Sequence, residues 1–279
     1  MLKEIAHFLK LNGFQSEILV RKDQDVLFVR CGEGDCSNVR CIVPLLVCAD
    51  SPMEACRQAE NTKELLESLE SEGLETVVIT EDRWRRQCDM MKARLLAHLE
   101  LFTSLYARNC EVRKIDKAVA GPFLGENHSY GDAACRYRYG MYLRRPSRDG
   151  KLQAGTLVAV ATFSNARKWI KGEKTIRSYE WTRYASLPGV RISGGMGKML
   201  KAFVKEVQPD DVMSYADLEW SEGKVYEQLG FVLEGRKDPV MFVLDAQWGR
   251  FPVKPGMAGE RFFMNLGSNK YRLKLTQYE

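Results

Sequence analysis

The sequence predicts a mixed α/β chain in two parts, and three observations support this. Short runs rich in β-branched and aromatic residues alternate with longer segments whose apolar residues recur at helical spacing. The pattern restarts near Tyr106, which places a boundary at about residues 104–110. The 279 residues suffice for one large domain or two smaller ones. We therefore expect a small α/β domain over residues 1–104, a mixed sheet flanked by helices over 105–245, and an extension with a hairpin over 246–279.

The composition is that of an ordinary globular protein. Hydrophobic residues make up 45%, charged residues 28%, and the formal net charge is +5. This mild charge permits an anionic ligand, and it permits nucleic acid without favouring it. No apolar run is long enough to span a bilayer and the first residues do not resemble a signal peptide, so we expect a cytoplasmic protein without a membrane partner. Its eight cysteines are then expected to be reduced thiols.

The first part is predicted to begin with an amphipathic helix that stops at Gly13, followed by the strands "QSEILV", "DVLFVRC" and "VRCIVPLLVC". A long helix comes next. Ser51 suits its N-cap, Pro52 its first helical position, and Glu54 the capping box. Gly73 marks its end, and the strand "ETVVIT" and a further helix complete the part.

The second part is predicted to run from a strand and a short helix through three neighbouring strands, the last being "SYEWTRYAS". Gly194, Gly195 and Gly197 then lie where a loop becomes an amphipathic helix. Glycines allow a ligand to approach the backbone, and the first free N–H groups of a helix favour an anion. With Arg191 and Lys198 nearby, this turn is a candidate pyrophosphate cradle. The alternative, that these glycines only make a tight turn, is equally compatible with this stretch alone.

Two segments in this order resemble the GNAT superfamily of acyl-CoA-dependent N-acyltransferases. "SGGMGKML" is similar to the pyrophosphate loop of the family, and "KVYEQLGF" is similar to its "Y-E-K-L-G-F" ending. The match covers roughly Cys110 to Asp245. "FLGENHSYG" and "SYADLEWSEGKVYEQLGF" look closer still to GNAT-like domains of phage and mobile-element proteins. The chain departs from the pattern at Ile192, where the family has Arg or Gln. It also lacks the usual Asn before the tyrosine helix, so we expect Ser221 as the N-cap.

The resemblance implies a fold and an activity. The strand before the glycine turn would splay from its neighbour, and the pantetheine arm of acetyl-CoA or another acyl-CoA would fill the gap. Tyr226 matches the position of the acid that protonates the departing thiolate, and Glu180 is our candidate base. The alternatives are a packed aromatic for Tyr226, and a solvated carboxylate or a partner of Arg183 for Glu180. The residues expected to contact acyl-CoA are Tyr184, Ala185, Ser186, Arg191, Ser193, Gly194, Gly195, Met196, Gly197 and Lys198.

Four residues are candidates for the site of the amine acceptor. Asn127 and His128 lie in the loop after the first helix of the second part, where the family often builds that site. An imidazole side chain generally titrates near neutrality, so His128 is a second candidate base. Asp217 and Trp220 lie beside the Tyr226 helix and would contact the acceptor, or else cap and pack that corner.

In related mobile-element proteins the preceding segment resembles a restriction-endonuclease core, and the layout of residues 1–104 is compatible with that. Metal-dependent cleavage would need clustered carboxylates and usually a lysine. Asp25 and Glu17 are present, but "VRCIVPLLVC" has no Glu-x-Lys, so we interpret this part as non-catalytic, serving in binding or dimerisation.

A second metal reading concerns four cysteines of the first part. Zinc sites prefer closer pairs than this set offers, so we expect no metal there. The four are Cys31, Cys36, Cys41 and Cys48.

Three functions therefore stay open. The first is an acyl-CoA-dependent N-acyltransferase that acts on an unidentified amine. The second is a GNAT-like module without catalysis that acts as a binding or nucleic-acid-associated protein. The third is a metal-dependent nuclease in the first part. The sequence also leaves a homodimer open.

Overall fold

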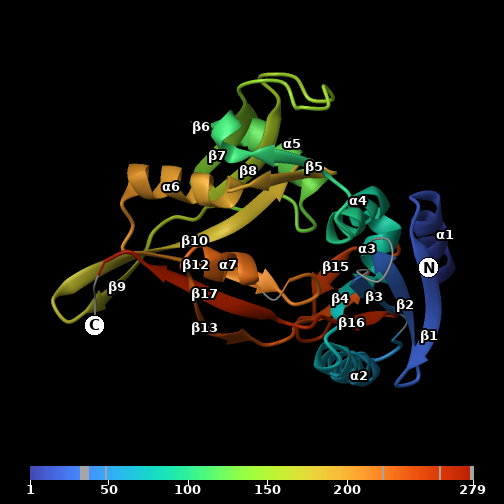
Figure 1. Cartoon of the computed structure of the whole chain (residues 1–279). Coiled ribbons are helices and arrows are strands. Elements are labelled where there is room, and N and C mark those ends of the chain that lie inside the picture. The colour runs from blue at the N-terminus through green and yellow to red at the C-terminus, as the bar shows by residue number, and fades with distance from the viewer. Residues whose placement is uncertain (32–37, 48, 222, 258, 277–279) are drawn as a thin grey trace. The chain divides into compact units, whose positions relative to one another are not determined.

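The computed structural model describes the whole chain except residues 32–37, 48, 222, 258 and 277–279. The chain forms two compact units (Figure 1). Unit 1 comprises Met1–Leu99, Asp217–Ser221 and Lys237–Ser268. Unit 2 comprises Glu100–Ala216, Glu222–Arg236 and Asn269–Glu279. The predicted boundary therefore lies near the first passage of the chain between units, whereas the segments predicted as one domain and one extension are each distributed over both units.

Unit 1 contains a four-stranded sheet in the order β1-β2-β3-β4. Its strands are β1 (Gln15–Arg21), β2 (Gln24–Cys31), β3 (Asn38–Leu45) and β4 (Glu75–Thr80). The first two pairs are antiparallel and β3–β4 is parallel. Its helices are α1 (Leu2–Leu11), α2 (Pro52–Ser71), α3 (Glu81–Arg86) and α4 (Cys88–His98). Leu27 and Val29 pack with α1, α3 and α4, while Val26 packs with α2, so the helices cover both faces.

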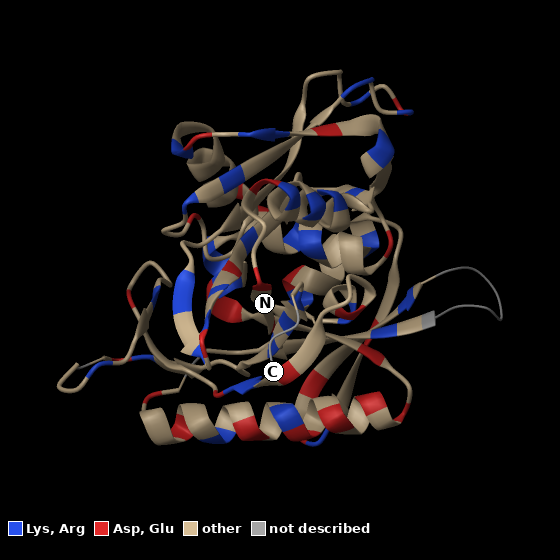
Figure 2. Ribbon diagram, turned by 90° about the vertical axis from the view of Figure 1, so that its left-hand side faces the viewer, with Lys and Arg blue, Asp and Glu red and all other residues tan. Residues whose placement is uncertain are grey.

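Helix α2 begins and ends as the sequence predicts. Ser51 Oγ accepts a hydrogen bond from the Glu54 amide at 3.2 Å, and Pro52 is the first helical residue. Gly73, at φ +77°, follows the last turn. Figure 2 shows the charged residues distributed along α2, which leaves one apolar stripe to face the sheet.

Late segments of the chain complete unit 1. The strands β14 (Met241–Leu244), β15 (Arg250–Pro252) and β16 (Phe262–Met264) form a small antiparallel sheet. Phe242 and Phe263 from this sheet join the core that lies against α2. The N-terminal part is therefore not packed by its own residues alone.

The predicted C-terminal hairpin is wrong. β16 pairs with β14, whereas β17 (Ser268–Lys274) belongs to the large sheet of unit 2. Asn265 Oδ1 accepts from the amides of Val240 and Gly267, so the turn is bonded to an earlier segment. Gly267 has φ +81°, and a Cβ there would lie 2.5 Å from the carbonyl oxygen of Lys237.

Unit 2 is built on a mixed sheet in the order β13-β17-β12-β10-β8-β7-β6, with β9 paired to β10. The strands are β6 (Cys110–Lys114), β7 (Tyr137–Leu143), β8 (Leu157–Phe163), β9 (Arg167–Lys171), β10 (Lys174–Ser186), β12 (Asp211–Asp217), β13 (Val232–Lys237) and β17. The neighbours from β6 to β10 are antiparallel and β10–β12 is parallel. The mixed α/β fold with helices flanking a large mixed sheet is thus confirmed.

Helices cover both faces of this sheet. They are α5 (Lys117–Asn127), α6 (Gly195–Val207) and α7 (Lys224–Gln228). Ala159 and Ala161 of β8 pack in the core with α6, while Val160 between them packs with α5, so α5 and α6 lie on opposite faces. The N-cap of α7 is Gly223, not Ser221 as predicted, and a Cβ at Gly223 would lie 2.3 Å from the Tyr271 ring.

Candidate active site

The central strands β10 and β12 pair over only three residues. The last pair joins Glu180 to Met213, although β10 continues to Ser186 and β12 to Asp217. Beyond that pair β10 stays with β8, after a register shift that follows Trp181. We call this divergence of β10 and β12 the fork. It is the splay that the resemblance leads us to expect, and it leaves backbone groups of both strands without their ladder partners.

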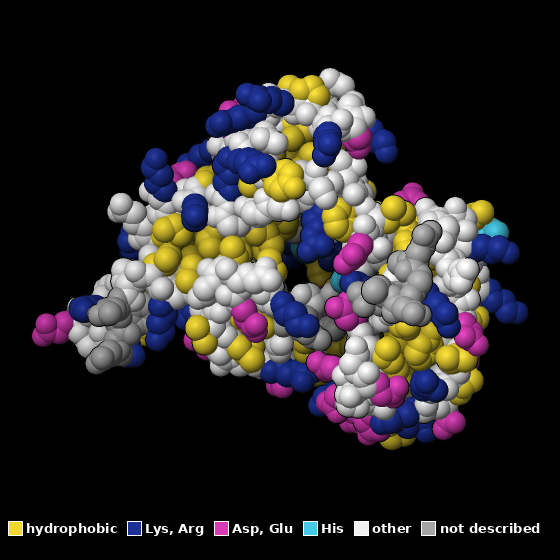
Figure 3. Space-filling view, in the orientation of Figure 1, with side chains coloured by type: hydrophobic (Ala, Val, Ile, Leu, Met, Phe, Trp, Pro, Cys, Tyr) yellow, Lys and Arg dark blue, Asp and Glu magenta, His cyan; other side chains and the backbone are white. Residues whose placement is uncertain are grey.

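The hydrophobic surface beside the fork is partly exposed. Figure 3 shows hydrophobic side chains gathered between α6 and α7 in unit 2. Partly buried residues of the core there include Met196 on α6 and Tyr226 and Leu229 around α7. Apolar surface of this kind suits an alkyl or pantetheine-like chain more than a strongly hydrated ligand.

The glycine turn opens α6 without a capping side chain. Gly194 is the N-cap at φ +72°, and its carbonyl oxygen accepts from the amide of Lys198 at 3.0 Å. The amides of Gly195, Met196 and Gly197 therefore precede the first hydrogen bond of the helix. A Cβ at Gly195 would lie 2.9 Å from the Tyr184 hydroxyl of β10, so a larger residue would require Tyr184 to shift. These amides are the donors that an anion would use.

The other residues predicted around this turn are placed differently. Lys198 Nζ donates to the carbonyl oxygens of Ala107 and Cys110, so its charge ties α6 to the preceding chain rather than facing a ligand. Arg191 is exposed and lies over the Phe102 ring at 5.2 Å. Ile192 is buried in the core of unit 2.

Ser193 sits beside the turn at the end of β11 (Val190–Ser193). This strand pairs in parallel with β5 (Thr103–Tyr106), where Ser193 is opposite Tyr106. Ser193 and Gly194 are both exposed. The entry to α6 is therefore anchored by backbone pairing on one side and open on the other.

The end of β10 carries the residues expected along the pantetheine arm. Tyr184, Ala185 and Ser186 are opposite Ala161, Val160 and Ala159 of β8. In such a ladder alternate backbone groups point away from the partner strand, which here is toward the fork. Ser186 Oγ donates to the Val190 carbonyl oxygen. Burial raises the pKa of the Tyr184 hydroxyl, so this tyrosine is neutral at physiological pH.

Tyr226 places its hydroxyl at the fork. Its Oη lies 2.8 Å from Ser214 Oγ of β12, the residue directly after Met213. Its ring packs edge-on against Trp181 and Phe231 and stacks on Tyr271 at 5.4 Å. Burial raises the pKa of Tyr226, and the contact with Ser214 opposes that rise. The packed-aromatic and proton-donor readings are thus both compatible with its position, because the ring is packed and the hydroxyl reaches the fork.

Glu180 is at the fork on the opposite face of β10. Tyr179 and Trp181 pack on the α6 side, so Glu180 between them points to the α5 side. It is partly buried, and its amide donates to Ser164 Oγ. Arg183, the alternative partner, donates from Nε to the Gly131 carbonyl oxygen at 3.0 Å and from Nη1 to its neighbour's carbonyl.

Asn127 and His128 are engaged locally. Asn127 Nδ2 donates to the Phe123 carbonyl oxygen within α5. His128 Nδ1 accepts from the Tyr130 amide at 3.1 Å, which puts the ring proton of a neutral imidazole on Nε2. The nitrogen that could act as a base is therefore already used, and we do not carry His128 forward as the base.

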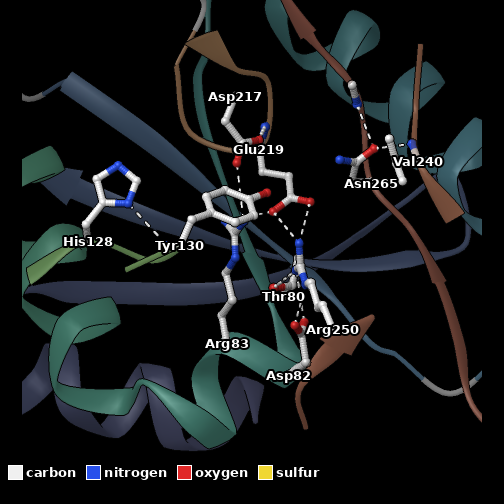
Figure 4. A network of polar contacts seen from close by, with 11 residues as sticks. Thr80, Asp82, Arg83, His128, Tyr130, Asp217, Glu219, Val240, Arg250 and Asn265 are labelled. Carbon is white, nitrogen blue, oxygen red and sulfur yellow. Dashed lines mark hydrogen bonds and ion pairs between the residues drawn. The ribbon is translucent and has the colours of Figure 1, made fainter. Parts of the chain in front are cut away.

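Asp217 and Trp220 belong to unit 1. Asp217 accepts from Arg83 at 3.2 Å and from the Glu219 amide, in a polar cluster that Figure 4 shows. Trp220 is buried, with Arg94 over its ring at 4.5 Å. Capping and packing, the alternative left open for these two residues, is what the structure displays.

Most of the residues weighed as metal ligands lie in the sheet of unit 1. No group of three or more His, Cys, Asp or Glu suited to a metal ion occurs among the described residues. Glu17 and Asp25 are exposed on β1 and β2, and Cys41 is buried in β3, where burial raises its pKa to about 11. Cys36 and Cys48 lie outside the described residues. Among the helices that the structure describes, none is long and apolar enough to cross a membrane.

Sequence reasoning missed Ser214. It stands in "SYAD", a segment quoted for its likeness, but a serine in a strand gives no signal of its own. Its position one residue beyond the last β10–β12 pair is visible only once the register is known.

No family model and no curated protein matches the chain. Solved structures do match. A GNAT-family acetyltransferase from Bacillus anthracis is 14% identical, with 60% of this chain and 95% of that chain covered and a TM-score of 0.32. The ribosomal-protein-S5-alanine acetyltransferase from Vibrio fischeri is 10% identical, with 61% of this chain and 96% of that chain covered and a TM-score of 0.36. The aminoglycoside N(6')acetyltransferase from Legionella pneumophila is 13% identical, with 60% of this chain and 92% of that chain covered and a TM-score of 0.31. Each of these is a protein to which part of this chain is similar.

Proposed function

We propose that unit 2 is an acyl-CoA-dependent N-acyltransferase that transfers an acetyl or other acyl group to an amine. The observation that carries the proposal is the fork. The two central strands part after Glu180 and Met213, the Tyr226 hydroxyl lies at the point of parting, and β10 ends against the uncapped start of α6. These are the three parts that a thioester cosubstrate needs: a slot, an acid and an anion cradle.

The cosubstrate would lie along β10. The amides of Gly195, Met196 and Gly197 would donate to the pyrophosphate, aided by the helix dipole. Backbone groups of residues 184–186 that face the fork would bond the pantetheine amides. Lys198 would not bind the pyrophosphate through its side chain, because its ammonium group donates to two carbonyl oxygens. It would only help to hold the start of α6 in place.

The acid and the base would work from opposite faces of β10. The amine nitrogen attacks the thioester carbon, a C–N bond forms and the C–S bond breaks. Glu180, on the α5 side, would take the amine proton directly or through water, and Tyr226, on the α6 side, would protonate the thiolate. Glu180 lies at the last β10–β12 pair and Tyr226 contacts Ser214, the next residue of β12, so on different faces one proton can leave while another arrives without the groups competing.

A second candidate, a GNAT-like binding module without catalysis, is favoured by one observation. Ile192 is buried where the family places Arg or Gln, so the cradle has no side-chain cation or amide from that position. Such a module would bind nucleic acid with steep salt dependence and show no response to CoA.

Ligand binding separates the two candidates. Acetyl-CoA and CoA should raise the thermal midpoint, whereas NAD and ATP should not. Ser193→Asp should weaken acetyl-CoA binding, measured by calorimetry, because its carboxylate would repel the pyrophosphate beside α6. Ser71→Asp, an exposed site in unit 1, makes the same charge change and should leave the affinity unaltered. Absence of any acyl-CoA binding would overturn the proposal.

Turnover then tests Tyr226. With a panel of primary amines, CoA release from acetyl-CoA should fall by ~100-fold or more in Tyr226→Phe, since general acids contribute on that scale. The CoA affinity should stay near that of the wild type because the ring is retained. Equal turnover by the two proteins would remove Tyr226 from the mechanism.

A further inference from the structure

Ser214 occupies a defined place at the fork. It is the β12 residue after Met213, where the next rung with β10 would be Trp181. Instead of a ladder bond, Ser214 Oγ lies 3.0 Å from the Trp181 carbonyl oxygen and 2.8 Å from Tyr226 Oη. Only 2% of Ser214 is exposed. Its side chain therefore connects the two diverging strands and the candidate acid.

The number of protons fixes the direction of these bonds. A serine hydroxyl has one proton and can donate it once, and a carbonyl oxygen can only accept. When Ser214 donates to Trp181, the second bond must be donated by Tyr226 to Ser214. When Tyr226 is ionised, the phenolate oxygen can only accept, and a charged acceptor attracts the serine proton more strongly than a neutral carbonyl does.

We propose that Ser214 is a positioning residue with two hydrogen-bonding states, which holds the Tyr226 hydroxyl at the fork and donates to its oxygen once Tyr226 has given up its proton. The proposal rests on the proposed function, because it needs a leaving group that takes the phenolic proton.

The step balances without a further reagent. As the C–S bond breaks, the Tyr226 O–H bond breaks and an S–H bond forms on CoA. The Ser214 O–H rotates from the Trp181 carbonyl oxygen to the phenolate oxygen, and the carbonyl remains an unbonded acceptor at the mouth of the fork. A proton from solvent then restores the phenol after CoA leaves, and Ser214 returns to Trp181.

The surroundings of Tyr226 favour such a donor. Its ring packs against Trp181, Phe231 and Tyr271, and a phenolate in an apolar site is costly. Titratable groups on the packed elements include Lys224 and Glu227 of α7, Tyr271, which donates to Glu227 at 3.3 Å, and Tyr184 beside Trp181. Burial raises the pKa of Tyr226 and Ser214 lowers it, which agrees with a role in stabilising the phenolate.

Two readouts test this inference. In the first, NMR of ¹³Cζ-labelled tyrosine follows the ionisation of Tyr226 in the free protein. Ser214→Ala should raise its pKa above the wild-type value, and Ser214→Thr, which keeps the hydroxyl, should restore it. Ser147→Ala is the matched control, because Ser147 is also buried in unit 2 and its hydroxyl also bridges two partners, away from the fork.

The second readout is a double-mutant cycle on CoA release from acetyl-CoA with the amine panel. Ser214→Ala should lower turnover roughly tenfold, the scale of one hydrogen bond to a charged group. Adding it to Tyr226→Phe should cost nothing more, since Ser214 acts through that hydroxyl. The affinity for CoA should change by no more than about twofold.

The outcomes separate the two proposals. If acetyl-CoA does not bind, the proposed function fails, while the titration of Tyr226 still decides whether Ser214 controls the phenol. An unchanged Tyr226 pKa in Ser214→Ala, or additive losses in the cycle, would overturn the role of Ser214. If Ser214→Ala does not fold, Ser214→Cys keeps the volume with a weak donor and should give the same upward shift.

Discussion

Two buried polar clusters are built from one short stretch of sequence. Residues 217–221 belong to unit 1, where Glu219 meets Arg83 and Arg250, and the segments before and after them belong to unit 2, where Ser214 meets Tyr226. The unit 1 cluster contains guanidinium groups on both sides of its central carboxylate. The unit 2 cluster contains two neutral hydroxyls and one carbonyl.

The clusters differ in whether their polar contacts can be rearranged. Arg250 donates to Asp82, Glu219 and Thr80 and lies over the Phe263 ring at 4.1 Å, so it has little freedom left (Figure 4). Ser214 and Tyr226 have two hydroxyl protons for their two contacts, and because each hydroxyl can rotate and can either donate or accept, these bonds can be rearranged. A cluster held by ion pairs stabilises a fold, and a cluster with rearrangeable protons can perform chemistry.

The largest effect is expected at Arg250. Two guanidinium groups face three carboxylates, those of Asp82, Asp217 and Glu219, and removing one cation leaves buried anions unpaired. Arg250→Met keeps much of the volume and should cost about 3–5 kcal/mol of unfolding free energy in urea. It should not alter CoA affinity if the cluster is structural.

Glu219→Gln is the matched test of the charge count. Burial raises the pKa of Glu219, although Arg83 and Arg250 oppose it, so this carboxylate is the one in excess. Asp82 and Asp217 still neutralise the two arginines in Glu219→Gln, and the loss should be well below that of Arg250→Met. Equal losses would show that the number of charges does not govern the cluster.

Some of the features that place these two clusters could be predicted from the sequence. Strand and helix patterns, the cap at Ser51 and the order of the motifs predicted a mixed sheet flanked by helices. They did not predict that Arg83, in the run "RWRR", is buried, because an arginine-rich helix is usually solvated and its partners Asp217 and Glu219 lie far along the chain.

The same reason explains the missed interleaving of the units. β17 completes the sheet of unit 2 after a long excursion of the chain into unit 1, and no local signal marks such a return. Tyr226 and the glycine turn were found through a short motif. Ser214 was not, because its role depends on the register of two strands.

An intermediate effect is expected at Gly223, the N-cap of the helix that contains Tyr226. It has φ +90°, and a Cβ there would lie 2.3 Å from Tyr271, the ring that stacks on Tyr226. Gly223→Ala should cost about 2 kcal/mol and lower turnover, because Tyr271 and α7 must move. Gly172→Ala, at φ +61° with open space around it, isolates the backbone strain and should cost about 1 kcal/mol without affecting turnover. Equal effects of the two changes on stability and turnover would show that Gly223 does not position Tyr226.

The smallest effect is expected at Glu234, an exposed carboxylate that can be compared with the two buried clusters. Its carboxylate accepts from Arg272 at 2.7 Å and pairs with Lys270 at 2.6 Å, and the Arg272 hydrogen bond chiefly lowers its pKa to about 2. Because the folded-state pKa of Glu234 lies below the ordinary value, its ionised carboxylate contributes fully to the unfolding free energy above pH 4.5. This contribution disappears as the pH falls through about 2. Glu234→Gln should therefore cost less than about 1 kcal/mol at pH 7, since solvent screens an exposed pair, and the difference from the wild type should narrow in urea titrations at successively lower pH. A difference in unfolding free energy that stayed constant down to pH 2 would mean that Glu234 stabilises unit 2 by packing. Its ion pairs with Arg272 and Lys270 would then contribute nothing measurable to stability.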